Sequence, residues 1–292
     1  MAASRLTCVL DIKASLGECA IWSVDDGALW WVDINAPTLN RFDPVTRRNE
    51  AMSMPASAGS FAMRERGGFV IALRDGLWLA DGKGRLERRI ADAPYDPAHH
   101  RFNDGRCDRQ GRFFVGTMNE NRDANTGALY RLDADHSLVA VMGDMMISNG
   151  LAWSPDGRTM YHADTPTRVV HAYDYDVHRG MPGRRRRFAS WTADGDRPDG
   201  ACVDSEGCYW SAFYRGGKVV RISPEGRTLA EYPLDAMCPT MCALGGPDLR
   251  TLFVTTARQQ RSEEELARLP LSGGIFAVRV DVPGLPEPRF AA

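Results

Sequence analysis

The sequence repeats one pattern six times: a tight turn, and directly after it a run of β-forming residues such as ALWWVDI, FVIAL or RFFVGTM. The last turn residues are Gly27, Gly68, Gly111, Gly157, Gly207 and Leu249, so the repeats are 41 to 50 residues long. Repeats of about 40 to 50 residues are typical of the blades of a β-propeller. One blade cannot bury both of its faces, so six must pack side by side around an axis.

Each repeat also contains a later segment in which apolar and polar residues alternate, at 39–42, 76–80, 128–132, 168–175, 218–223 and 274–280. This alternation predicts half-buried antiparallel strands, and therefore an all-β, six-bladed propeller with four antiparallel strands in each blade. We expect the N-terminal segment 7–12 to join the last blade and close the ring. No linker interrupts the repeats, so residues 1–292 are expected to form a single domain. The capping pattern of Ser262 and Glu265 predicts one short helix over 262–268.

The charge and composition exclude several classes of function. There are 36 Lys and Arg against 38 Asp and Glu, which argues against a nucleic-acid or polybasic membrane partner. The run Arg184 to Arg187 is interpreted as a solvated loop between strands. No apolar run approaches the ~20 residues of a membrane helix, and no signal-peptide core is present, so we expect a cytoplasmic protein. The seven cysteines include no Cys-x-x-Cys pair, which favours reduced thiols.

Four polar residues lie in apolar segments at matching places in four repeats. Glu18, Asn103, Asn149 and Asp199 each precede their turn residue by 8 or 9 positions. Matching places put the four side chains at one level of the central channel. Two carboxylates and two amides form an oxygen-rich site that suits Ca²⁺, Mg²⁺ or Mn²⁺, and accepts Zn or Fe if water completes it. Taken alone, Asn149-Gly150 and Asp199-Gly200 are typical turn-forming pairs. The matching positions of the four residues favour a binding site instead, and so does Glu18, which no turn explains.

The segments LGECAIW, RFNDGRCDRQGRFFVGTM, SNGLAWSPDGRTMYHADT and PDGACVDSEGCYWSA resemble the SMP-30/gluconolactonase family, from about residue 15 to the C-terminus. The resemblance implies one divalent metal ion on the propeller axis and hydrolysis of aldonolactones. It implies that Glu18, Asn149 and Asp199 are the metal ligands, and that Asp199 is also the general base. It further implies that Arg101, Asn103 and Glu120 contact the sugar hydroxyls or a water on the metal. Cys19 stands where many relatives have proline.

The expected partner is a small sugar lactone, and the expected state is a monomer or a weak homo-oligomer. Two alternatives stay open: a phosphotriesterase or arylesterase at the same metal site, and a non-enzymatic calcium-binding propeller. No G-x-S-x-G motif occurs, which removes the α/β-hydrolase route to ester cleavage. We interpret His162, in the segment MYHAD, as a hydrogen-bonded structural residue. The sequence leaves open which aldonolactone is the substrate and which metal is bound.

Overall fold

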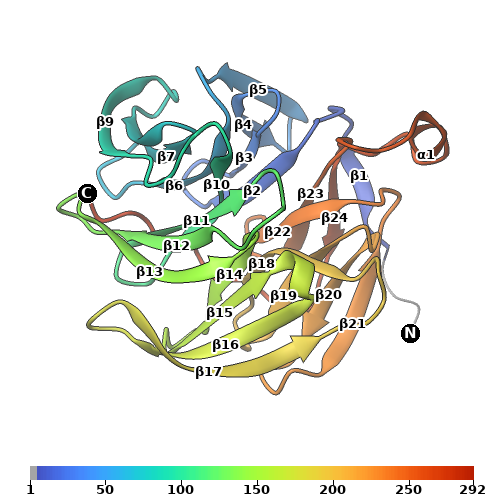
Figure 1. Cartoon of the computed structure of the whole chain (residues 1–292). Coiled ribbons are helices and arrows are strands. Elements are labelled where there is room, and N and C mark those ends of the chain that lie inside the picture. The colour runs from blue at the N-terminus through green and yellow to red at the C-terminus, as the bar shows by residue number, and fades with distance from the viewer. Residues whose placement is uncertain (1–4) are drawn as a thin grey trace.

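The computed structural model describes residues 5–292. Figure 1 shows six sheets arranged in chain order around a common centre, and each sheet contains four strands. Neighbouring strands within every sheet are antiparallel. The predicted all-β, six-bladed propeller is therefore confirmed.

The strands of the first three blades follow one another without a crossover. Blade 1 consists of β2 (Gly17–Ser23), β3 (Ala28–Asp33), β4 (Thr38–Asp43) and β5 (Arg48–Ser53). Blade 2 consists of β6 (Ala58–Met63), β7 (Phe69–Leu73), β8 (Gly76–Ala80) and β9 (Leu86–Asp92). Blade 3 consists of β10 (His100–Cys107), β11 (Phe113–Asn119), β12 (Gly127–Leu132) and β13 (Leu138–Met145).

The last three blades follow the same plan until the ring closes. Blade 4 consists of β14 (Ser148–Trp153), β15 (Thr159–Asp164), β16 (Val169–Asp176) and β17 (Met181–Ser190), with the 3₁₀ turn η1 (Thr165–Thr167) between its second and third strands. Blade 5 consists of β18 (Arg197–Val203), β19 (Tyr209–Tyr214), β20 (Lys218–Ile222) and β21 (Thr228–Pro233). Blade 6 consists of β22 (Pro239–Gly245), β23 (Thr251–Thr256), β24 (Ile275–Arg279) and β1 (Thr7–Leu10).

The N-terminal strand closes the ring, as the sequence predicts. β1 pairs antiparallel with β24 and supplies the outermost strand of blade 6. The two ends of the propeller thus share one sheet, so pulling blade 6 away from blade 1 would break backbone hydrogen bonds as well as apolar contacts.

The hydrophobic core lies between neighbouring blades. Each of six clusters of buried apolar side chains draws mainly on two adjacent blades. Between blades 6 and 1, for example, Trp22 stacks on Phe253 with ring centroids 5.4 Å apart. A blade alone would expose these faces, and at about 25 cal/mol per Å² of apolar area their burial favours the closed ring.

The short helix α1 (Glu263–Arg268) lies in the connection between β23 and β24. Ser262 caps it, because its side-chain oxygen accepts a hydrogen bond from the backbone N–H of Glu265 at 3.2 Å. The predicted helix is confirmed. No helix within residues 5–292 is both long and apolar enough to span a membrane.

The run Arg184 to Arg187 is not a loop, contrary to our interpretation. It belongs to β17, the outermost strand of blade 4, where Arg185 pairs with Tyr173 and Arg186 with Ala172. All four arginines are exposed, and Asp174 forms ion pairs with Arg184 and Arg186. Charged side chains are well tolerated on an edge strand, where they discourage pairing with another chain.

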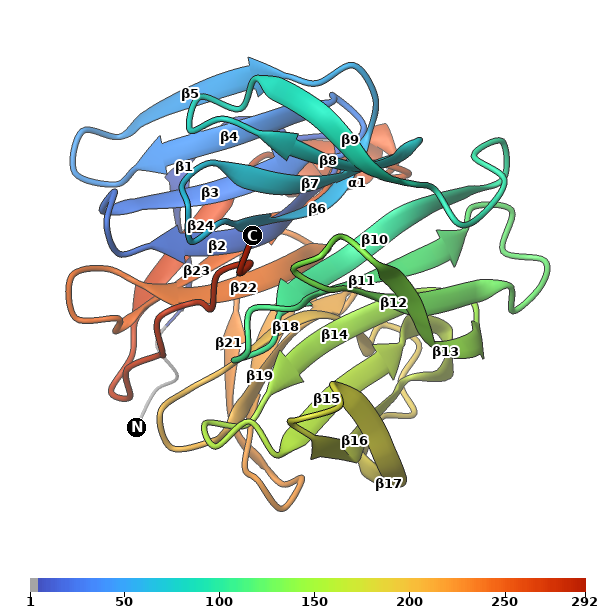
Figure 2. The same cartoon turned by 90° about the vertical axis from the view of Figure 1, so that its left-hand side faces the viewer.

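The C-terminal segment crosses the propeller after β24 (Figure 2). Its first part is held by blades 5 and 6, where the backbone N–H of Ser205 donates to Pro283 and that of Gly284 donates to Leu249. Its last part is held by blades 2 and 3 through the backbones of Phe290 and Ala291. The segment therefore ties together blades on opposite sides of the ring.

Candidate active site

The four polar residues of the repeat pattern meet at one end of the channel. Glu18, Asn103, Asn149 and Asp199 lie in the first halves of the innermost strands β2, β10, β14 and β18. All four line a single pocket of about 200 Å³, and none is more than 8% exposed. The structure thus brings together side chains from blades 1, 3, 4 and 5.

A break in strand pairing accompanies each of these side chains. The pairing register shifts between Glu18 and Ile21 in β2, between Asn149 and Ala152 in β14, and between residues 102 and 105 and residues 198 and 201 in β10 and β18. Bulges of this kind change the direction of a side chain and often occur beside active sites. Here they let polar residues leave the regular alternation of the strand and face the axis.

Hydrogen bonds fix the orientation of the two amides. Arg101 Nη1 donates to Asn103 Oδ1 at 2.7 Å, and Asn103 Nδ2 donates to Asn149 Oδ1 at 3.1 Å. Asn149 Nδ2 donates to Thr165 Oγ1 at 2.8 Å. With its N–H group committed to Thr165, Asn149 presents its carbonyl oxygen toward the site, where a second lone pair is available.

The two carboxylates of the pocket repel each other. Burial raises the pKa of Glu18 to about 8, with a further contribution from Asp104 and opposition from Arg101. Burial also raises the pKa of Asp199 well above its ordinary value, and the charges of Glu18 and Asp104 add to this. Buried like charges favour the binding of a cation or a proton.

These residues fit a hard divalent cation. Glu18 and Asp199 offer carboxylate oxygens and Asn149 offers an amide oxygen, which are ligands that such ions prefer. Within residues 5–292, no three His, Cys, Asp or Glu side chains are grouped closely enough to hold a metal. A metal at this position would therefore depend on amide and water oxygens as well as on the two carboxylates.

The other predicted residues divide into two groups. Arg101 lines the pocket beside Asn103 and is buried. Glu120 does not line the pocket: its two carboxylate oxygens accept hydrogen bonds from Arg74 at 2.7 and 3.0 Å, and one lies 3.6 Å from Arg101 Nε. His162 also lies outside this pocket and is buried, with its Nε2 2.8 Å from Ser148 Oγ.

Sequence reasoning missed several residues of the site. Asp104 does not line the pocket, but it is buried, its charge raises the pKa of both Glu18 and Asp199, and its Oδ2 accepts a hydrogen bond from the Leu151 backbone at 2.9 Å. The pocket mouth also includes Arg122, Arg197, Tyr214 and Gln259. Arg197 could have been found, because it precedes Asp199 by two positions as Arg101 precedes Asn103.

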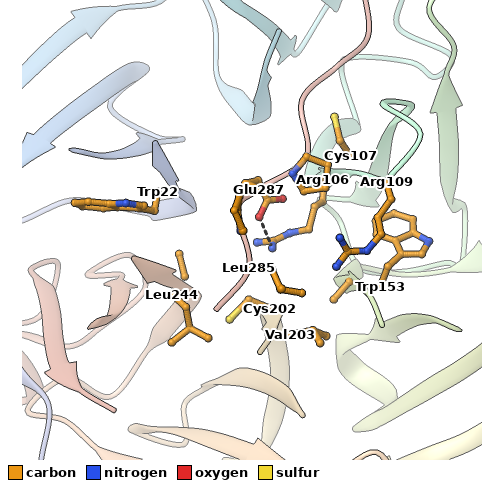
Figure 3. A pocket seen from close by; sticks show the side chains of 14 residues that line it. Trp22, Arg106, Cys107, Arg109, Trp153, Cys202, Val203, Leu244, Leu285 and Glu287 are labelled. Atoms are coloured by element: carbon orange, nitrogen blue, oxygen red, sulfur yellow. Dashed lines mark hydrogen bonds and ion pairs between the residues drawn. The ribbon is translucent and has the colours of Figure 1, made fainter. Parts of the chain in front are cut away.

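The C-terminal segment covers part of the opposite end of the channel. Figure 3 shows a small pocket there, between the far ends of the innermost strands and the C-terminal segment, and its volume is about 50 Å³. Arg106 of β10 reaches into it and forms an ion pair with Glu287 of the C-terminal segment at 2.9 Å. The larger of these two pockets therefore lies at the end that holds Glu18 and Asp199.

Comparison with known proteins gives the relationship directly. Residues 16–258 match the model of the SMP-30/gluconolactonase/LRE-like region. The chain belongs to the SMP-30/gluconolactonase family. The resemblance stated from the sequence motifs is thus confirmed, and this family member shares its whole length with named relatives.

Three relatives illustrate how much of the chain is shared. The chain is 50% identical to a 6-deoxy-6-sulfogluconolactonase of Pseudomonas putida, over 98% of both chains. It is 36% identical to the regucalcin of Xenopus laevis, over all of both chains. Among solved structures, a calcium-binding protein from Agrobacterium tumefaciens, also named regucalcin, superposes with a TM-score of 0.94 at 27% identity, again over all of both chains.

Proposed function

We propose that this protein is a lactonase that hydrolyses the ring ester of an aldonolactone to the open aldonic acid. The observation that carries the proposal is the convergence of Glu18, Asn149 and Asp199 in one buried pocket at one end of the channel. Membership of a family that includes gluconolactonases supports it. So does the 50% identity with a sulfogluconolactonase over nearly the whole chain.

We assign Glu18, Asn149 and Asp199 as the ligands of one divalent metal ion. When bound, such an ion supplies Lewis-acid polarisation of the lactone carbonyl. The buried pair of carboxylates supports this assignment, because two like charges removed from water are stabilised by a cation between them. The calcium-binding relative of known structure is consistent with a divalent ion.

Asp199 is assigned as the general base. It takes a proton from the attacking water while the water oxygen bonds to the carbonyl carbon. It then returns the proton to the ring oxygen as the carbon–oxygen bond of the ester breaks. A proton donor and acceptor of this kind typically contributes a factor of about 10² to 10⁴ in rate.

Arg101 and Asn103 are assigned to the substrate hydroxyls. Their mutual hydrogen bond at 2.7 Å and their burial fix both side chains before substrate arrives, which reduces the entropy lost on binding. Glu120 supports Arg101 from outside the pocket through the 3.6 Å ion pair. In this structure it would act on the substrate through Arg101.

The name of the Pseudomonas putida relative specifies a gluconolactone with a sulfonate on its sixth carbon, and this supports a finer proposal for the substrate. We propose that a lactone of this type is a substrate here. We also propose that the protein works in the cytoplasm: its seven cysteines are all free thiols, which suits a reducing compartment.

The proposal is tested by measuring acid release in a pH-stat with glucono-1,5-lactone and other five- and six-carbon aldonolactones, with metal content determined in parallel. Asp199→Asn should lower turnover by about 100-fold or more and leave the thermal unfolding midpoint near that of the wild type. Asp174→Asn, an exposed carboxylate on blade 4, is the matched control and should retain full activity.

Treatment with EDTA should abolish activity, and a divalent ion should restore it. If Asp199→Asn keeps most of its activity with metal bound, the general-base assignment is wrong. If activity survives complete metal removal, the metal assignment is wrong. If no lactone is hydrolysed while calcium binds, the protein is a calcium-binding propeller without this activity.

A further inference from the structure

The mouth of the pocket carries more positive charge than a neutral sugar lactone requires. Three arginines, Arg101, Arg122 and Arg197, line it together with the two carboxylates of Glu18 and Asp199. A divalent cation between the carboxylates would leave all three guanidinium groups without a counter-charge inside the pocket. An excess of this kind attracts anionic ligands and raises their local concentration.

Two of these arginines, Arg101 and Arg197, belong to a second layer of pocket residues, two positions earlier in the sequence than the polar residues of the site. Leu16, Arg101, Ile147 and Arg197 each precede a polar residue of the site by two positions, and all four line the pocket. Blades 1 and 4 thus contribute apolar groups to the layer, and blades 3 and 5 contribute guanidinium groups. Two residues along a strand span about 7 Å, so this layer is displaced along the strands from the candidate ligands.

The arginines differ in what they already bind. Arg101 Nη1 donates to Asn103 Oδ1 and to the backbone oxygen of Phe102, and Arg101 Nε lies near Glu120. By contrast, Arg197 makes one side-chain hydrogen bond, from Nε to the backbone oxygen of Asp194 at 3.2 Å. Arg101 is therefore already held by its neighbours, whereas the terminal nitrogens of Arg197 are free to bind a ligand.

The side chain of Arg122 makes fewer interactions than that of Arg197. It lies in the connection between β11 and β12, with a left-handed backbone (φ 56°). Within residues 5–292 its side chain has no hydrogen bond or ion pair, and neither it nor Arg197 has a carboxylate within 4 Å. A strained backbone at a non-glycine residue is often retained where it places a side chain for function.

We infer that Arg122 and Arg197 bind a tetrahedral oxyanion, sulfonate or phosphate, on the sixth carbon of the substrate lactone. Guanidinium groups suit this task because their N–H donors form paired, charge-assisted hydrogen bonds with such oxygens. The inference rests on the proposed lactonase function and names the residues that select among lactones. Sulfonate is the anion we assign.

The test compares three lactones: glucono-1,5-lactone and its 6-deoxy-6-sulfo and 6-phospho derivatives. Each is assayed with the wild type, Arg122→Met, Arg197→Met and the double variant. We expect the wild type to prefer the sulfonated lactone. Each single substitution should lower kcat/KM for that lactone by about 10- to 100-fold, mainly through KM, because one charge-assisted hydrogen-bonding group is lost.

The matched control is Arg88→Met, since Arg88 is an exposed arginine on the outer strand of blade 2. It should leave the preference for the sulfonated lactone unchanged. Raised salt should weaken the preference of the wild type, because ions screen the exposed part of the interaction.

The outcomes separate the inference from the proposed function. If the wild type hydrolyses all three lactones with equal kcat/KM, the anion site is wrong and the lactonase function stands. If it prefers the phosphorylated lactone and loses that preference in the variants, the site stands with phosphate as its anion. If no lactone is hydrolysed, calorimetry with 6-deoxy-6-sulfogluconate decides: tight binding that the double variant loses supports the site, and equal or absent binding in both overturns it.

Discussion

Removing the charge of Glu287 should destabilise the whole propeller, although this residue lies in the C-terminal segment and far from the candidate ligands along the axis. Its Oε2 is 2.9 Å from Arg106 Nη1, and the two side chains are only 18% and 8% exposed. Arg106 Nε and Nη2 have no partner within residues 5–292. Glu287 is thus the main counter-charge of a buried guanidinium group (Figure 3).

The size of the effect follows from this burial. Removing one partner of a buried ion pair typically costs about 3 to 5 kcal/mol, because the other charge stays buried and unpaired. We expect about 3 kcal/mol, the lower end of this range, for Glu287→Leu. Two features reduce the cost: Asp104 still interacts with Arg106, and the adjoining cavity of about 50 Å³ is large enough to admit water.

The measurement is urea unfolding of Glu287→Leu, Arg106→Met and the double variant. Replacing a buried pair by apolar groups is often neutral, so the double variant should lie within about 1 kcal/mol of the wild type. Glu225→Leu is the control, since its ion pair with Arg227 is exposed, and such a pair contributes about 0 to 1 kcal/mol. If Glu287→Leu unfolds with the same free energy as the control, or if the double variant is no more stable than the singles, the pair does not act as described.

Two further predictions concern buried residues of blade 4. Burial lowers the pKa of His162 to about 3, whereas in the unfolded chain this residue is protonated near pH 6.5. As the pH falls, the unfolded state therefore binds the proton first. The free energy of unfolding should decrease by about 3 kcal/mol between pH 6.5 and pH 4. Urea unfolding at pH 7 and pH 4 should show this loss in the wild type and not in His162→Gln, and equal pH dependence of the two would contradict it. Gly150→Ala should cost more than the control Gly27→Ala in thermal unfolding: both glycines have a positive φ, but only the new Cβ at Gly150 would lie 2.5 Å from Tyr209 Oη. Equal losses would show that the left-handed backbone alone decides the cost.

Most of the fold could be predicted from the sequence because its signals are local. A turn such as Asp25-Asp26-Gly27 and the alternation that follows it depend on neighbouring residues only, and six repeats of the pattern imply a ring. The charged run of β17 was misjudged because composition alone does not show pairing. Whether Arg185 lies in a loop or in an edge strand depends on its partner Tyr173 in another strand.

Those residues of the candidate site could be predicted whose positions match between the repeats. Glu18 and Asp199 were found because matching positions in separate repeats must lie at one level of the channel, and the structure places both in the same pocket. Asp104 was missed because it follows Asn103 directly, and strict alternation would turn it away from the axis. The register shift between residues 102 and 105 removes that alternation, and this irregularity has no signature in the sequence.

The backbone conformation of Cys19 affects how the carboxylate of Glu18 is held. Its φ is 48°, a value that proline, fixed near −65°, does not adopt. Its backbone N–H lies 3.3 Å from Glu18 Oε2, a donor that proline lacks. A strand with proline at this place must therefore hold its glutamate through a different backbone. The backbone that supports Glu18, a proposed ligand, is thus one that only a residue other than proline can adopt at position 19. The proposed selection among lactones would then act in the layer two residues earlier in each strand, where Arg197 lines the pocket together with the apolar Leu16 and Ile147.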